Sequence, residues 1–464
     1  MTSSLLLDPA FLGMAMIVVF MTLIMTRRLS AITALIVVPV IFGLIAGAGA
    51  GIGDMMIQGV VALTPTALML AFAVLYFGLM MDAGLFDPLV RFVLRTVGDD
   101  PVRVTVGTAL LAGTVALDGD GATTALVTIT AMLPVYRRLG LNPLILALLL
   151  GLCTAVANLV PWGGPAARAA SALQIDPALL FLPMMPTMAA GLGFAVLVAW
   201  WLGLRERKRL GALTLQPLPH QPLPMTAHAV AGPAPDASPA EAVLNAEDDS
   251  QTHAETRRPK LFLFNLALTL ALIAGLLLGL LPLPVLMMSA FAIALIVNYP
   301  DLKAQRRRIA AHAENVINIV LLIFAAGAFT GILQGTGMVE AMANALVAAI
   351  PPSMGPYLAP ITALVSMPLT FFMSNDAFYF GMLPVIAETA AHYGVPPEAI
   401  ARASLTALPV HAMSPLIAAI YLVAGMLKVE VGELQRFALK WAVLASIVMI
   451  LASLATGAFP FRVG

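Results

Sequence analysis

The chain has 464 residues, of which 61% are hydrophobic and 10% are charged, and its formal net charge is zero. A typical soluble domain has about 25% charged residues, so the composition excludes an ordinary soluble protein and indicates an all-α polytopic membrane protein. Zero net charge gives no general attraction to nucleic acid, and the single cysteine, Cys153, excludes an internal disulfide framework and a multi-cysteine metal site.

Long apolar segments in the first part of the chain predict membrane spans of about 20 residues. Three spans come first, then a short amphipathic helix, two helical arms on either side of a polar tip at Asp118, an interrupted span and a final span. These segments are, in chain order, 9–26, 31–50, 57–81, 87–97, the arms 101–117 and 124–138, the interrupted span 142–173 and the final span 177–203.

Residues 204–259 break this pattern. The stretch 216–249 is rich in Pro, Ala, Ser and acidic residues, which is typical of a flexible linker. After it the same series returns, with its second polar tip at Asn375. The segments are 260–281, 283–299, 312–335, 339–349, the arms 357–373 and 377–391, the interrupted span 397–427 and the final span 432–457.

Four short segments recur along the chain in the same order, always 250 to 254 residues apart. A constant distance over four matches predicts an internal repeat, with one half at residues 1–203 and the other at 260–464. The matched segments are 78–87 with 331–340, 132–134 with 382–384, 140–143 with 394–397, and 173–176 with 427–430.

The basic residues orient the two halves in the membrane. If the hairpins 101–138 and 357–391 are re-entrant, each half crosses five times, which predicts about ten spans and inverted topology. Of 24 basic residues, all but Arg168, Arg402 and Arg462 then fall on one side, which the positive-inside rule makes cytoplasmic. This orientation predicts a protein of the cell membrane with a cytoplasmic linker and with both termini on the outer side. Arms of about 17 residues reach about 25 Å, so full spans also fit, but tips without Lys or Arg favour re-entry.

The first tip places charge inside apolar sequence, at Asp118 and Asp120. A charged residue at the membrane centre costs roughly 2.5–3.5 kcal/mol, so such residues usually face a cavity, a partner or a permeant ion. Two close carboxylates can bind a hard divalent cation or share a proton. Thr123 and Thr124 add hydroxyl groups, and the helix that begins here offers its N-terminal amides to an anion. The alternative is a solvated turn with an aspartate as helix cap.

The first interrupted span contains a Pro-Trp-Gly-Gly-Pro sequence followed by Arg168. Such a break frees backbone groups at membrane depth, and an arginine there can bind a carboxylate in bidentate fashion. A structural ion pair with Asp118 or Asp120 is the alternative for Arg168. The candidate substrate-binding residues of this break are Asn158, Gly163, Gly164 and Arg168.

The second tip and the second interrupted span provide the corresponding candidates. Ser374, Asn375 and Asp376 form the tip, where Ser374 could equally cap a helix. In the span, Ser414 is a candidate for substrate binding and His411 for proton transfer, although a purely structural histidine fits as well. Broken helices at corresponding positions of two halves indicate a transporter binding site.

Three segments together resemble the citrate–metal:proton symporters (CitMHS family). They are LDGDGATTALVTITAMLPVYRRLG at 117–140, NLVPWGGPAARAASAL at 158–173 and MSNDAFYFGMLPV at 373–385. The wider resemblance is to the ion transporter superfamily, whose sodium-coupled members carry Ser-Asn-Thr at each tip. Here Asp376 takes the place of that threonine and the first tip is acidic, which fits proton coupling or contact with a metal.

The resemblance implies a secondary active transporter that imports citrate as a complex with a divalent cation, Mg²⁺-like or Ca²⁺-like. It further implies coupling to protons, a homodimer and an elevator-type mechanism, with no prosthetic group. The metal candidates are Asp118, Asp120 and Asp376, and these three with His411 are the proton-coupling candidates. The substrate-binding candidates are Thr123, Thr124, Asn158, Gly163, Gly164, Arg168, Ser374, Asn375 and Ser414.

Two other classes remain open on sequence grounds. One is another member of the same superfamily, such as a dicarboxylate transporter or a sodium/proton-type exchanger. The other is an ion channel or a membrane-embedded enzyme. Because the chain has no Walker A loop, HExxH or GxSxG motif, neither ATP-driven transport nor familiar hydrolase chemistry is indicated, and we expect no enzymatic activity.

Overall fold

The computed structural model describes residues 8–26, 28–211 and 256–463, and within these ranges all regular structure is helical. The helices before the linker are α2 (Pro9–Met25), α3 (Ala31–Ile45), α4 (Ile52–Asp82), α5 (Asp87–Val97), α6 (Pro101–Val115), α7 (Gly121–Leu139), α8 (Pro143–Ala157), α9 (Gly164–Ala172) and α10 (Pro177–Leu210). Those after it are α12 (Phe262–Leu277), α13 (Leu283–Asn298), α14 (Leu302–Gly335), α15 (Met338–Ala349), α16 (Leu358–Phe372), the π-helix η5 (Ala377–Met382), α17 (Leu383–Ala391), α18 (Pro397–Leu405), α19 (Leu408–His411), α20 (Ala418–Leu427) and α21 (Val431–Thr456).

Side-chain caps fix where many of these helices begin. Asp or Asn side chains accept the first free backbone amides of α2, α6, α7, α8, α10 and α14, and Ser30 does so for α3. Such a cap stabilises a helix by about 1 kcal/mol. Proline follows directly after the cap in α2, α6, α8 and α10, where its missing N–H is not needed. The polar residues between apolar runs therefore set the boundaries of the helices.

Most helices begin and end within a few residues of the predicted segments, and α5 covers the predicted residues 87–97. Three segments differ. The third span after the linker, predicted at 312–335, begins at Leu302 because Asp301 caps it. The second interrupted span is broken twice, after Leu405 and after His411. The final span predicted at 177–203 continues to Leu210.

The longer α10 corrects the start of the predicted linker. Its basic end is helical because its charges are paired: Arg209 Nη2 lies 2.6 Å from Glu206 Oε2, and Arg207 Nε donates to Asp100 Oδ1 at 3.1 Å. Partial burial raises the pKa of Asp100, but hydrogen bonds from Arg207 and from the Val102 amide lower it more, so the net shift is downward. The rest of the linker prediction falls mainly on residues 212–255, outside the described residues.

Six helical segments of the described chain are long and apolar enough to cross a membrane: Gly49–Asp82, Pro177–Leu210, Pro259–Leu277, Leu302–Gly335, Gly355–Phe372 and Val431–Thr456. Seven shorter apolar helices accompany them, including α2, α3, α8 and α13. The chain is a multi-pass membrane protein, and the count of about ten spans stays a prediction. Gly355–Phe372, expected as a re-entrant arm, is itself 18 residues long.

The two long helices α4 and α14 pack against each other in opposite directions. A Cβ atom added at Gly331 of α14 would lie 2.2 Å from the Met55 carbonyl oxygen of α4, so glycine is required there. Towards the other end of the pair, Asp82 Oδ2 lies 3.2 Å from Arg308 Nη1 and 3.0 Å from His312 Nε2. The start of α4 therefore packs against the end of α14 and the end of α4 against the start of α14, so the two helices are antiparallel.

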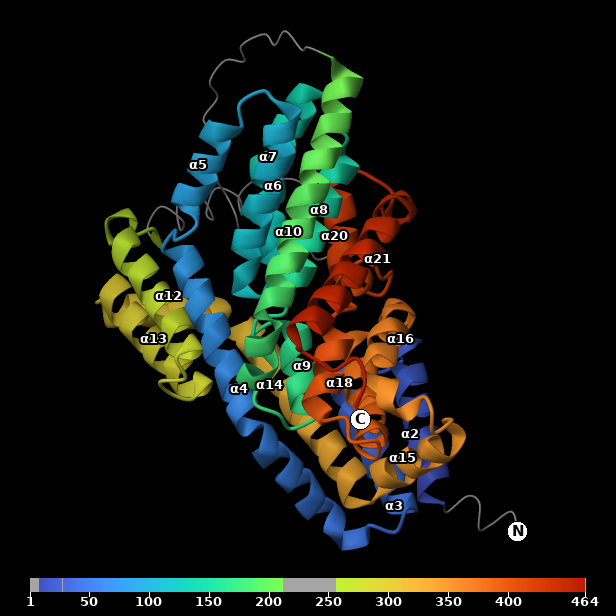
Figure 1. Ribbon diagram of the computed structural model, residues 1–464. Helices are drawn as coiled ribbons and strands as arrows, with labels where there is room; N and C mark the ends of the chain where they lie inside the picture. The colour runs from blue at the N-terminus through green and yellow to red at the C-terminus, as the bar shows by residue number, and fades with distance from the viewer. Residues whose placement is uncertain (1–7, 27, 212–255, 464) are drawn as a thin grey trace.

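The remaining helices form groups around this pair (Figure 1). In that view α6, α7, α8 and α10 gather at one end of the molecule, and α2, α3, α15 and α16 at the other. Helices α12 and α13 lie along one flank of α4, whereas α20 and α21 lie beside α8 and α10. The short helices α9 and α18 lie between the two groups, where α9 contacts both α18 and η5. Both interrupted spans thus meet in the middle of the fold.

Candidate binding cavity

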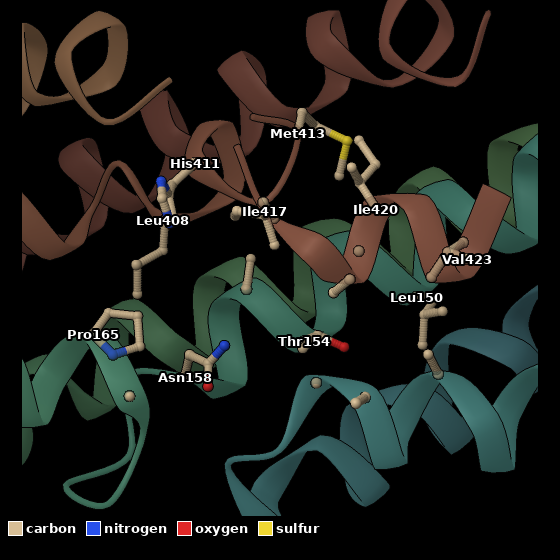
Figure 2. A pocket seen from close by; sticks show the side chains of 18 of the residues that line it. Leu150, Thr154, Asn158, Pro165, Leu408, His411, Met413, Ile417, Ile420 and Val423 are labelled. Atoms are coloured by element: carbon tan, nitrogen blue, oxygen red, sulfur yellow. The ribbon is translucent and has the colours of Figure 1, made fainter. Parts of the chain in front are cut away.

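A cavity of about 370 Å³ lies where the first tip, the two interrupted spans and the second tip converge. Its walls come from the first tip, α7, α8, α9, α19, α20 and α21, with Asn375 from the second tip. Figure 2 shows that its two ends differ: Asn158 and His411 lie at one end, and Leu150, Ile420 and Val423 lie at the other. The cavity is therefore polar where the tips meet and apolar where α8 faces α20.

The first tip is a tight turn that closes α6 and opens α7. A short 3₁₀ turn follows α6, and Gly119 then adopts a left-handed conformation with φ of +84°. Asp118 Oδ1 accepts the amide of Asp120 at 2.9 Å. Asp120 caps α7 by accepting the amides of Ala122 at 3.1 Å and Thr123 at 3.2 Å, and it also accepts the Thr123 hydroxyl. The carboxylate of Asp120 is thus fixed at the cavity wall.

The second tip contributes an ion pair that joins the two halves. Arg168 of α9 donates from Nε to Asp376 Oδ1 at 2.6 Å, and the two side chains are 19% and 17% exposed. The terminal nitrogens of Arg168 make no hydrogen bond within the described residues, and Arg168 lines the cavity. Neither Asp118 nor Asp120 pairs with Arg168 in the described chain, so Asp376 is the partner that sequence reasoning did not find. An arginine held through Nε can still offer its other nitrogens to a ligand carboxylate.

The first break depends on glycine. A Cβ atom at Gly163 would lie 2.3 Å from the Asn158 carbonyl oxygen, so the chain cannot turn here with a larger residue. A Cβ atom at Gly164 would lie 3.0 Å from Arg168 Nη1. The Gly-Gly pair therefore brings the start of α9, and Arg168 one turn later, to the cavity.

In the second interrupted span, His411 and Ser414 bind the end of the hairpin arm α16. His411 Nδ1 lies 2.7 Å from the Thr370 carbonyl oxygen, and Ser414 Oγ donates to the Phe371 carbonyl oxygen at 2.6 Å. Because a carbonyl can only accept, His411 carries its hydrogen on Nδ1. Both side chains thereby satisfy carbonyl groups that a helix leaves unpaired at its C-terminus.

Some buried polar atoms around the cavity have no partner among the described residues. They include Asn375 Oδ1, His411 Nε2 and Thr154 Oγ1, and all three residues line the cavity. A buried polar atom without a partner costs about 1–3 kcal/mol. Unsatisfied atoms around a cavity are therefore candidates for contact with a polar ligand.

The structure brings part of the predicted site together. Asp120, Asn158, Gly164, Arg168, Asn375 and His411 line the cavity. The other predicted site residues lie in the adjoining turns or helix starts without lining the cavity: Asp118, Thr123, Thr124, Gly163, Ser374, Asp376 and Ser414. Ser374 caps the helix after the second tip by accepting the Ala377 amide at 3.2 Å, and Thr124 is fully buried. The three predicted metal carboxylates do not gather, and no group of three His, Cys, Asp or Glu in the described ranges could hold a metal ion.

Sequence reasoning missed Thr154 and the apolar end of the cavity. Thr154 lies four residues before Asn158 on α8, so both project from one face of the helix. That spacing was the available signal for Thr154. The apolar wall from α20, including Ile420 and Val423, has no polar residue that could have marked it.

Solved structures with a similar fold are those of transporters. The Neisseria gonorrhoeae protein MtrF, described as illuminating a class of antimetabolite efflux pumps, is 14% identical over 87% of this chain and 83% of its own, with a TM-score of 0.55. The Alcanivorax borkumensis YdaH transporter is 14% identical over 98% of this chain and all of its own, with a TM-score of 0.54. At this identity the likeness concerns the fold alone. The fold class is a multi-pass helical membrane protein with interrupted helices around a cavity.

Sequence comparison then gives the family. The family model described as "Citrate transporter" (CitMHS) matches residues 8–407. Two Bacillus subtilis (strain 168) proteins match as well: a citrate transporter, 52% identical over 97% of this chain and 100% of its own, and a "Mg(2+)/citrate complex secondary transporter", 50% identical over 98% and 100%. The chain belongs to the citrate transporter family, so it is a transporter and not an enzyme.

Proposed function

We propose that this protein imports citrate across the cell membrane as a complex with one divalent cation, in symport with protons. The observation that carries the proposal is the cavity itself. Arg168 and Asp120 both line this space, and the hydrogen bond of Arg168 to Asp376 uses only its Nε. A guanidinium group and a carboxylate around one cavity suit a ligand that has both a carboxylate and a bound metal ion.

The charge of the ligand favours the complex over free citrate. Transfer of a multiply charged anion into a site of low dielectric constant carries a desolvation penalty that grows with its charge. A bound divalent cation cancels two of the three negative charges of citrate. Because the protein offers no preformed cluster of metal ligands in its described part, we propose that the carboxylates and hydroxyl of citrate hold the ion, with Asp120 facing it.

The Arg168–Asp376 pair supports a route for proton coupling. A citrate carboxylate that binds Arg168 competes with Asp376 for the same guanidinium group. Protonation of Asp376 would remove the negative charge that competes with the citrate carboxylate for the guanidinium group. Substrate binding and proton uptake at Asp376 are then linked, and Asp118, Asp120 and His411 remain further proton-coupling candidates.

The remaining candidates have supporting roles in this proposal. Asn158, Asn375 and the start of α9 at Gly164 contact the substrate from the cavity wall. Thr123 and Thr124 act through the first turn of α7, which Asp120 caps. Gly163 shapes the first break, and Ser374 and Ser414 hold the second tip in place.

The inverted repeat is part of the proposal, and the α4–α14 pair supports it. Gly78 lies against His312, and Gly59 lies against Gly331. The two contacts are equivalent under the repeat, since 78 and 331, like 59 and 312, differ by 253. Further support comes from Gln174 and Lys428, the two non-glycine residues of the described chain with positive φ, which occupy aligned positions in the two halves. Equivalent helices that pack antiparallel are expected of halves with opposite orientation.

An elevator mechanism, a homodimer, re-entrant hairpins and external termini complete the proposal. They rest on the family resemblance and on the convergence of both hairpin tips and both interrupted spans at one cavity. In this arrangement α4 and α14 stay together as one unit, because their close backbone contact at Gly59 and Gly331 leaves no space for one helix to slide along the other.

The test is uptake of labelled citrate by proteoliposomes across a panel of divalent ions. An inside-alkaline pH gradient without sodium is expected to drive accumulation in the presence of Mg²⁺ or another accepted ion. Uptake driven by a sodium gradient at equal pH would contradict the proton-coupled mechanism. Uptake of metal-free citrate at an undiminished rate would contradict the substrate assignment.

A further inference from the structure

Trp162 lies in the first break and joins three parts of the fold. Its indole Nε1 donates to the Leu117 carbonyl oxygen at 2.8 Å. Its ring packs on Phe77 of α4, with 5.1 Å between the ring centroids. Trp162 is 8% exposed and is not among the residues that line the cavity, so its side chain supports the cavity wall from behind.

The hydrogen bond lies at the point where the first hairpin arm ends. Leu117 is in the 3₁₀ turn after α6, where carbonyl groups no longer have a partner from their own helix. Gly119 follows in a left-handed conformation, and a Cβ atom there would lie 3.1 Å from Cδ1 of the indole ring. The ring therefore supports both the carbonyl before the turn and the turn itself.

The consequence reaches the cavity through one more residue. Asp120, which directly follows Gly119, lines the cavity and caps α7. A shift of the turn would move this carboxylate and the first amides of α7 together. The second half contains a similar device made of different residues, since Ser414 and His411 bind the last carbonyls of α16 before the second tip.

We propose that Trp162 is a positioning residue that holds the first hairpin tip, and with it Asp120, in the substrate-binding arrangement. The indole N–H fixes the tip, while the contact with Phe77 fixes the indole against α4. This inference rests on the proposed function for its effect on transport, but not for its effect on the tip.

The chain offers a matched control at Trp441 of α21. Its indole Nε1 is buried and has no hydrogen-bond partner within the described residues. Trp162→Phe and Trp441→Phe make the same chemical change, but only the first removes a hydrogen bond. Loss of a bond to a buried carbonyl is expected to change an equilibrium by about five- to tenfold.

One arm of the test needs no substrate. Ala116, at the start of the turn, is 1% exposed, so Ala116→Cys should react slowly with a small thiol reagent in the solubilised full chain. Because Trp162→Phe removes one hydrogen bond, we expect it to raise this labelling rate at least about fivefold. Trp441→Phe removes no hydrogen bond and should leave the labelling rate unchanged. The buried Cys153 gives the background in the parent chain. Equal rates in the two variants, or fast labelling with Trp162 intact, would overturn the inference.

The other arm measures uptake of magnesium citrate. Trp162→Phe should raise KM about tenfold and leave the maximal rate within about twofold, since binding and not folding is affected. A KM equal to that of Trp441→Phe, or a fall in rate that only follows a loss of thermal stability, would overturn the positioning role. If the unmodified protein took up no metal–citrate at all, the proposed function would fail, and the labelling arm would still decide the role of Trp162.

Discussion

Substitution of Asp376 by Asn separates proton coupling from substrate binding. In the structure Asp376 Oδ1 accepts Arg168 Nε at 2.6 Å, with both side chains less than one-fifth exposed. Asparagine keeps the size and an acceptor oxygen at this position but cannot take up a proton or compete as an anion for the guanidinium group. We therefore expect Asp376→Asn to bind citrate at least as well as the unmodified protein.

The size of the effect follows from the ion pair. A hydrogen bond to a charged group is worth about 1.5–3 kcal/mol, which corresponds to roughly a ten- to 150-fold change in an equilibrium. Arg168→Gln should therefore raise the KM for the complex at least about tenfold. It also leaves Asp376 buried without its cation, so this variant should lose thermal stability as well. Asp376→Asn should lose less thermal stability than Arg168→Gln, because Arg168 lines the cavity and its remaining charge is not fully enclosed by protein.

The assay compares two modes of transport in the same proteoliposomes. Exchange of internal for external labelled citrate requires the carrier to move while loaded, whereas accumulation against a gradient requires proton movement. Asp376→Asn should retain exchange within about threefold and lose pH-driven accumulation by about tenfold or more, given the linkage of protonation to charge pairing. Equal losses in both modes, or normal accumulation, would refute the coupling role of Asp376.

Three further results are expected. Asp120→Asn keeps one acceptor oxygen for the first amides of α7 but removes a charge from the cavity wall, so it should lower transport about tenfold. Asp118→Asn should lower transport less than about threefold, because Asp118 does not line the cavity; initial uptake rates measure both effects. Thr154→Val removes a hydroxyl group that lacks a partner in the described chain, so it should raise KM by about three- to tenfold without loss of melting temperature; an unchanged KM would exclude contact with the substrate. Excess chelator should abolish citrate uptake, and restoring the free divalent ion should recover it; uptake that persists would mean that free citrate is carried.

Local sequence signals predicted the helices well because each depends on neighbouring residues. The apolar runs gave the approximate bounds of most helices, and glycine marked the first tip and the first break, whereas the second tip (373–376) and the second break (408–415) contain no glycine. The sequence placed the end of the final span at residue 203, because the charged residues that follow it were assigned to the linker. In the structure Glu206 and Asp100 pair with its basic residues and keep it helical to Leu210.

The pairing within the site could not be predicted from local sequence. Arg168 and Asp376 are 208 residues apart, and no spacing rule connects them. Sequence reasoning offered Asp118 or Asp120 only as an alternative ion-pair partner of Arg168, and in the structure Asp120 instead accepts the first amides of α7. The metal candidates Asp118, Asp120 and Asp376 remain a prediction, and in the structure each of these carboxylates accepts a hydrogen bond from the protein.

The central claim is that citrate and a divalent cation cross the membrane together. Initial rates of uptake of radiolabelled citrate and of a radiolabelled divalent cation, measured in the same proteoliposomes with an inside-alkaline gradient and no sodium, test it most directly. The proposal predicts that each flux depends on the other solute and that their molar ratio is about one at all concentrations, as expected for a single complexed substrate. Citrate uptake without a matching flux of the cation would contradict it.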